Sequence, residues 1–167
     1  MLKTVLKYGL ISGGLLMVSM VATFVLFKDQ PWAHSQVVGF IIMFAILSLI
    51  FFGIREQKTK NLGGRIGFGH AFLTGLLITL VCSLIYTLCW MAISYNDPIM
   101  VENMLDGYYN PTGAELSADK AADLAQTKAD YDKPLYRFGM TMMEIFPVGL
   151  LLTLVFAVVH VLTPRKG

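Results

Sequence analysis

The sequence predicts an all-α integral membrane protein with four transmembrane helices, both termini in the cytoplasm and one short extracytoplasmic helix between spans three and four. Composition is the first observation: of 167 residues, 56% are hydrophobic and 14% charged, whereas about a quarter of a soluble domain is charged. The second is that the apolar residues fall into four long blocks, in a chain with mean hydropathy +0.64. The third is an uneven distribution of lysine and arginine between the connections.

The four apolar blocks predict spans at about residues 8–27, 37–54, 68–95 and 135–162. A helix needs roughly 20 residues to cross about 30 Å of hydrocarbon. Residues 37–54 form the shortest block and are expected to cross with little tilt. Residues 8–27 are expected to be retained rather than cleaved, because the apolar run exceeds that of a signal peptide. All four spans are assigned to a single domain, residues 1–167.

Charge sets the predicted orientation, because lysine and arginine near short loops are retained in the cytoplasm. On the side of the termini, one acid, Glu56, accompanies the basic residues Lys3, Lys7, Arg55, Lys58, Lys60, Arg65, Arg165 and Lys166. The other side holds most of the acids, and the aromatic residues Trp32, Trp90, Tyr95 and Tyr136 gather at its predicted boundary, as interfacial rings do. The sequence therefore predicts a multi-pass membrane protein with cytoplasmic termini.

The connection 96–134 is the only sizeable segment outside the spans. Ser117 is a candidate N-cap, an alanine-rich run follows, and Pro134 ends it, which predicts a short helix over about 116–131. The carboxylates of this segment lack the spacing of a calcium loop, so we interpret them as a solvated face. A docking surface for a partner is the alternative.

The chain resembles a known family. The strings that carry the resemblance are LKYGLISGGLL, LGGRIGFGHAF followed by GLLITLVCSLIYTLCW, and YDKPLYRFGMTMMEIFPVGLLLTLVFAVV with its E-x-x-P-V-G motif. They are similar to domain-of-unknown-function family 4199 (DUF4199), small bacterial inner-membrane proteins. The resemblance implies the four-span fold and no particular activity. His70 departs from the lysine or other polar residue of many members, so no role is carried over to it.

A carboxylate, that of Glu144, lies inside the last span, with Pro147 just after it. A carboxylate in hydrocarbon is costly unless it is protonated, paired or hydrated. Pro147 lacks an N–H, so the carbonyl of Met143 loses its usual partner. We therefore expect a buried polar cluster between spans three and four with Glu144 as its acceptor, comprising Glu144, Tyr86, Thr141, Ser83, Trp90 and Arg137.

Small residues at four-residue spacing predict the faces on which helices approach closely. These helix-packing positions are Gly9, Gly13, Ala71, Gly75, Gly149 and Thr153. The spacing leaves open whether they pack within one chain or between chains.

The sequence names no reaction. No catalytic motif is present, His34, His70 and His160 are not placed to share a metal, and no cofactor or nucleic acid is expected. The first hypothesis is a structural or accessory membrane component, in contact with the lipid bilayer and with a second copy or another membrane protein. The alternative is a small transporter or channel subunit that uses Glu144 as a proton or cation site.

Overall fold

The computed structural model describes residues 1–23, 36–110 and 115–163. Four helices in this part are long and apolar enough to cross a membrane: α1 (Leu2–Val21), the stretch Val37–Asn61, α4 (Phe68–Asn96) and α7 (Pro134–Leu162). The described residues contain no strand. The prediction of an all-α protein with four transmembrane helices is confirmed.

The second span is longer than the predicted 37–54. It consists of α2 (Gln36–Leu47), α3 (Leu49–Glu56) and a wide π-helical turn, η3 (Gln57–Asn61). Between α2 and α3, the Ser48 hydroxyl donates a hydrogen bond to the Phe44 carbonyl. The polar residues of η3 continue the helix beyond the apolar block because they have partners on neighbouring helices, as described below. The first span also begins earlier than predicted, at Leu2, and predicted residues 24–27 lie outside the described part.

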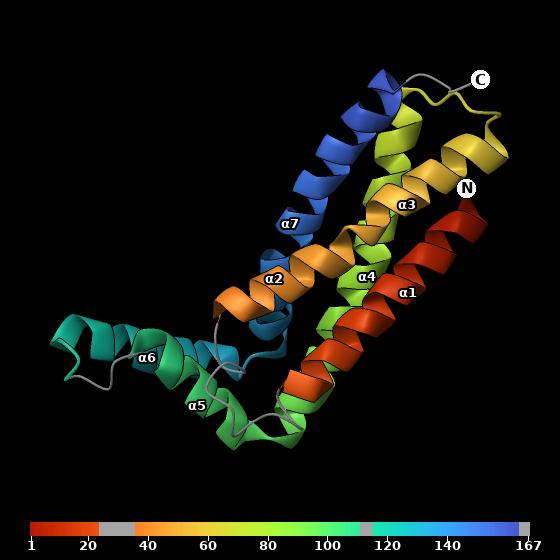
Figure 1. Cartoon of the computed structure of the whole chain (residues 1–167). Coiled ribbons are helices and arrows are strands. Elements are labelled where there is room, and N and C mark those ends of the chain that lie inside the picture. The colour runs from red at the N-terminus through yellow and green to blue at the C-terminus, as the bar shows by residue number, and fades with distance from the viewer. Residues whose placement is uncertain (24–35, 111–114, 164–167) are drawn as a thin grey trace.

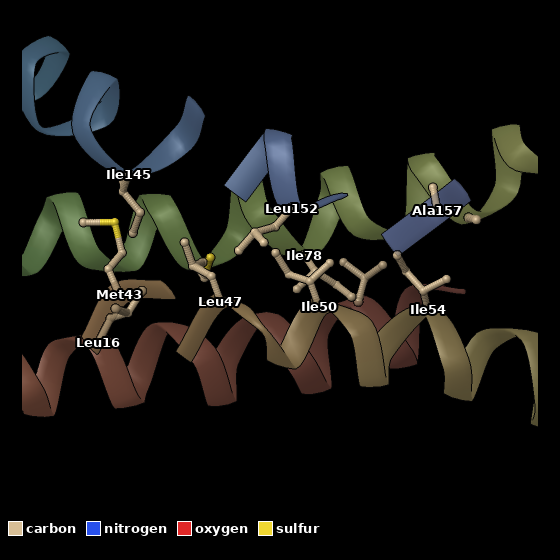
Figure 2. Packing of buried hydrophobic residues seen from close by; sticks show 12 residues of the cluster. Leu16, Met43, Leu47, Ile50, Ile54, Ile78, Ile145, Leu152 and Ala157 are labelled. Atoms are coloured by element: carbon tan, nitrogen blue, oxygen red, sulfur yellow. The ribbon is translucent and has the colours of Figure 1, made fainter. Parts of the chain in front are cut away.

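Helix α4 lies between α1 and α7 and packs along both, while α2 and α3 cross the group obliquely (Figure 1). The buried core runs where the four spans meet, with Ile78 of α4 beside Ile50 of α3 and Leu152 of α7 (Figure 2). At one end of this core, Ile145, Met43 and Leu16 come together (Figure 2).

Glycines allow α1 to approach α4. A Cβ added at Gly9 would lie 2.7 Å from the Val81 side chain, and one at Gly13 would lie 2.7 Å from Ile85. Real side chains do not approach so closely, so these two positions bring the helix backbones together. The contact is made within one chain.

Small residues also line the contact between α4 and α7. A Cβ added at Gly75 would lie 2.7 Å from Thr153, and one at Gly149 would overlap Thr79. The two threonine hydroxyls hydrogen-bond across the interface at 3.1 Å, and Ala71 is fully buried. The helices therefore meet through small side chains and one interhelical hydrogen bond.

The connection between α4 and α7 contains two helices, where the sequence predicted one. The expected helix is α6 (Ala118–Tyr131), with Ser117 as its N-cap residue. The unexpected one is α5 (Pro98–Tyr109), which begins with Pro98 and is capped by Asp97, whose side chain accepts from the Met100 N–H at 3.0 Å. We call α5 and α6 the hairpin.

The hairpin has its own small core. Val101 and Leu105 of α5 are buried with Tyr131 of α6, and Tyr109 and Thr127 share a hydrogen bond of 2.8 Å. Hydrogen bonds to Asp106 and Glu102 raise the pKa of Lys128 and link the two helices on their exposed side. The hairpin lies beyond the end of the spans, away from the bundle core (Figure 1).

The start of α1, the end of α7 and the connection from α3 to α4 lie at one end of the bundle, which we call the terminal end; the hairpin lies at the opposite end, the hairpin end (Figure 1). The basic excess at the terminal end predicts that this end is cytoplasmic. We expect a cysteine at Ala118 to react with an impermeant thiol reagent added outside the sealed membrane, and a cysteine at exposed Lys60 not to react.

This labelling is measured in a background in which Cys82 and Cys89 are replaced by alanine. Disruption of the membrane is the control, because both sites should then react. Labelling at Lys60 but not at Ala118 in the sealed membrane would reverse the predicted orientation.

Candidate functional site at the hairpin end

Arg137 is a buried cation in the first turns of α7, with 4% of its surface exposed. Its Nε donates to the Tyr131 carbonyl at 2.9 Å and its Nη1 donates to Ser94 Oγ at 3.1 Å. The guanidinium carbon lies 4.3 Å from the centre of the Tyr95 ring and 5.0 Å from that of Tyr131. Asp132 is 3.8 Å away but largely solvated, so carbonyl, hydroxyl and aromatic faces stabilise most of the charge.

The Tyr131 side chain extends the contact to α4. Trp90 Nε1 donates to the Tyr131 hydroxyl at 2.8 Å, and both side chains are buried. Burial raises the pKa of the Tyr131 phenol and the charge of Glu144 adds to the rise, while the Trp90 hydrogen bond and Arg137 oppose it. We call Arg137, Tyr131, Ser94, Tyr95 and Trp90 the Arg137 cluster.

Local sequence explains how the cluster forms. Trp90 and Ser94 lie one turn apart and thus on one face of α4. Tyr131 is the last residue of α6, and Pro134 starts α7 only three positions later, because proline suits the first turn of a helix. This short link brings Arg137 back over the end of α6. Three helices, α4, α6 and α7, are therefore joined by one cluster.

Glu144 is not the centre of this cluster, which differs from the sequence-based expectation of a buried acceptor. Its side chain is exposed, and no described residue forms a hydrogen bond or ion pair with it. The buried positions of α7 include Arg137, Thr141 and Ile145 at four-residue spacing. Glu144 precedes Ile145 by one residue, so it points about 100° away from that face.

The other predicted residues fall into three groups. Thr141 lies beside Arg137 and donates to the Arg137 carbonyl at 2.9 Å. Ser83 is fully buried, and its hydroxyl has no hydrogen-bond partner among the described residues, like the hydroxyls of Ser12 and Thr87. Tyr86 is half-buried and packs against the main core. The structure therefore joins Trp90, Arg137 and Thr141 in one network, and it leaves Ser83, Tyr86 and Glu144 outside that network.

Sequence reasoning missed Tyr131, Ser94 and Tyr95 as partners of Arg137. The available signal was a basic residue inside a predicted span, close to interfacial tyrosines and to a serine at the end of the preceding span. A buried guanidinium needs several acceptors or aromatic faces. Searching for these around Arg137 would have identified the cluster.

A second set of buried polar contacts lies at the terminal end. Buried Lys58 in η3 donates to the carbonyls of His160 and Thr163 at 2.6 and 2.7 Å. A lysine at this position satisfies the free carbonyls at the end of α7 and complements its dipole.

Polar side chains also join α1 to the end of the second span. Gln57 accepts hydrogen bonds from Thr4 and Asn61, and Glu56 accepts from Lys7 and Tyr8. Within the described ranges, no three histidine, cysteine or acidic residues are placed to hold a metal ion. The polar contacts at this end therefore hold the helices together.

Comparison with known proteins identifies a family. The model of a family described as protein of unknown function (DUF4199) matches residues 7–160, nearly the whole chain. No curated protein and no solved structure matches the chain.

Proposed function

Since the chain belongs to the DUF4199 family, whose description names no activity, we propose from its geometry that it is a structural or accessory component of a bacterial inner membrane. Its four spans hold the hairpin in a fixed position at the outward-facing surface of that membrane. The observation that supports this proposal is the Arg137 cluster, which joins the hairpin to α4 and α7.

The composition of the Arg137 cluster favours a structural role, in which it attaches the hairpin to the spans, over a role in transport. The Nε and one terminal nitrogen of Arg137 donate to protein acceptors, and its charge is stacked against two aromatic rings. Removing a charged side chain from water costs several kcal/mol unless such partners compensate. A cation held this way is suited to a fixed structural position.

The hairpin needs this attachment to the spans in order to keep a fixed position. Its own core is small, and two short helices of this size do not form a stable domain alone. Fixing them to the bundle lowers the entropy lost when a partner binds. The outward side of α6 carries alternating charges, among them Asp119, Lys120 and Asp123, all exposed. The proposed partner is another membrane protein or a second copy of the chain, bound without a chemical reaction.

Photo-crosslinking in native membranes tests this function. A photoreactive amino acid at Asp123, on the exposed side of α6, should yield a discrete crosslinked species, whereas one at exposed Lys60, at the terminal end, should not. Arg137→Gln should weaken the crosslink at Asp123 while the chain remains inserted, because the hairpin is no longer held. No discrete product from Asp123, or a product indifferent to Arg137→Gln, would contradict the proposal.

The alternative function, a small transporter or channel subunit, is favoured by one observation: Glu144 is exposed in the middle of a span. Its test is proton or potassium flux in proteoliposomes that contain a pH-sensitive dye. Flux that requires Glu144 and disappears in Glu144→Gln would favour transport. Flux equal to that of empty vesicles would favour the structural function.

A further inference from the structure

Glu144 is an exposed carboxylate at membrane depth. It lies four residues from the midpoint of α7 (Pro134–Leu162), or roughly 6 Å along the helix axis. No described residue forms a hydrogen bond or ion pair with it. A lone ionised carboxylate is costly in hydrocarbon, whereas a neutral carboxyl group with a hydrogen-bond partner is tolerated there. Such a partner must come from outside the described part of the chain.

Glu144 lies on the exposed face of α7. Met140 is one turn before it and Leu151 two turns after it on the same side of the helix, and both are exposed. Pro147 is exposed as well, and it supplies no N–H to the carbonyl of Met143. A carboxyl group and a backbone acceptor therefore lie next to each other on this face, between apolar side chains.

A neutral carboxyl group is complementary to a second one. Its O–H donates and its C=O accepts, so two carboxyl groups that face each other satisfy both donors with both acceptors. Water is absent from the hydrocarbon core and does not compete for these hydrogen bonds. The exposed face of α7 thus carries a group that can pair with a copy of itself.

The neighbouring surface at this depth is apolar. Helices α4 and α7 run in opposite directions and Gly149 faces Thr79, so Glu144 lies at about the level of Leu84. The exposed side chains near this level include Leu84 and Leu88 of α4 and Leu15 of α1. Among the described residues, the group on a second copy that matches Glu144 at its own depth is therefore Glu144.

We propose that two copies of the chain associate through the exposed face of α7 and that their Glu144 carboxyl groups hydrogen-bond to each other. Copies inserted in the same orientation pair about a two-fold axis along the membrane normal, where each residue near the axis meets its own counterpart. The two α7 helices cross at Glu144 and separate toward their ends. This contact goes beyond the proposed attachment of the hairpin, because Glu144 takes no part in the Arg137 cluster.

Disulfide crosslinking in native membranes tests the contact. Alanine replaces Cys82 and Cys89, and a single cysteine is placed at exposed Met140 or, as the matched control, at exposed Leu88 of α4. Oxidation with copper phenanthroline should join Met140→Cys into a disulfide-linked homodimer, because this position lies near the proposed axis, and should leave Leu88→Cys monomeric. No homodimer from Met140→Cys, or equal crosslinking of the two variants, overturns the proposal.

Substitutions at Glu144 test the chemistry of the contact. Energy transfer between donor-labelled and acceptor-labelled copies in liposomes gives the apparent dissociation constant, with the labels on Lys60→Cys in the same background. Glu144→Leu should weaken association about tenfold or more, because two interhelical hydrogen bonds are lost, and leucine suits lipid, so the chain stays folded. Glu144→Gln should associate nearly as well as the original chain, because an amide also donates and accepts.

The liposomes contain no other protein, so absence of energy transfer between unsubstituted copies would assign Glu144 to a different partner and overturn the proposal. An unchanged dissociation constant in Glu144→Leu, or equal weakening in Glu144→Gln and Glu144→Leu, overturns it too. Photo-crosslinking from Asp123 reports on a different surface and responds to Arg137→Gln, which should leave the Met140→Cys crosslink unchanged. The two proposals can therefore fail separately.

Discussion

Replacing Arg137 with methionine should release the hairpin from the bundle while the four spans stay folded. Methionine fills similar space but donates no hydrogen bond, so the Tyr131 carbonyl and Ser94 lose their partner. Hydrogen bonds from a charged donor contribute about 1.5–3 kcal/mol each. Removing the buried charge offsets part of this loss. A net loss of roughly 2 kcal/mol corresponds to about a thirtyfold increase in hairpin opening.

Hydrogen exchange measured by mass spectrometry reports this opening segment by segment. Amides of α6 should exchange faster in Arg137→Met by about this factor, whereas those in the centre of α4 should not. Arg137→Lys should give an intermediate result, because an ammonium cannot reproduce the planar arrangement of donors. Arg55→Met is the matched control, since Arg55 is exposed at the terminal end. Unchanged exchange in α6 would mean that Arg137 does not hold the hairpin.

The sequence was sufficient to locate the spans because hydrophobic length is a property of each segment alone. Which side of a span faces the protein core is not a property of the segment alone. Lipid and protein core are both apolar, so a membrane helix carries little amphipathic signal on its lipid and core sides. Ile145 and Glu144 are adjacent, and only the contacts of α7 with the other spans decide which of them faces inward. The sequence suggested Glu144 as the centre of a polar cluster, whereas in the structure Arg137 is at the centre of that cluster.

The missed helix α5 has a related explanation. Its start signals, Asp97 and Pro98, are visible in the sequence, but its two buried residues, Val101 and Leu105, have meaning only beside Tyr131 of α6. A helix of this length is marginal without tertiary contacts. A distant partner also decides where the second span ends. The η3 turn extends this span because Lys58 donates hydrogen bonds to the carbonyls at the end of α7. Long-range partners decided both boundaries.

Leucine at Gly149 should destabilise the bundle more than leucine at an exposed position of α7. Even the Cβ of an alanine would overlap Thr79, so leucine must push α4 and α7 apart along their shared face. Overpacking typically costs about 1–3 kcal/mol, and here the Thr79–Thr153 hydrogen bond of 3.1 Å is lost as well. We expect a clear fall in the melting temperature in detergent, with Gly149→Ala affected in the same direction but less.

Val158→Leu is the matched control, because Val158 is 45% exposed on the same helix and its added methylene meets no packed neighbour across an interface. A second variant separates steric overlap from loss of helix packing in general. If Thr79 is the obstacle, Thr79→Ala combined with Gly149→Ala should recover part of the stability that Gly149→Ala loses, although Thr79→Ala alone removes the hydrogen bond to Thr153. Equal, small effects of leucine at Gly149 and Val158 would place Gly149 against lipid. Failure of Thr79→Ala to recover stability would mean that the backbones, not this side chain, set the separation of α4 and α7.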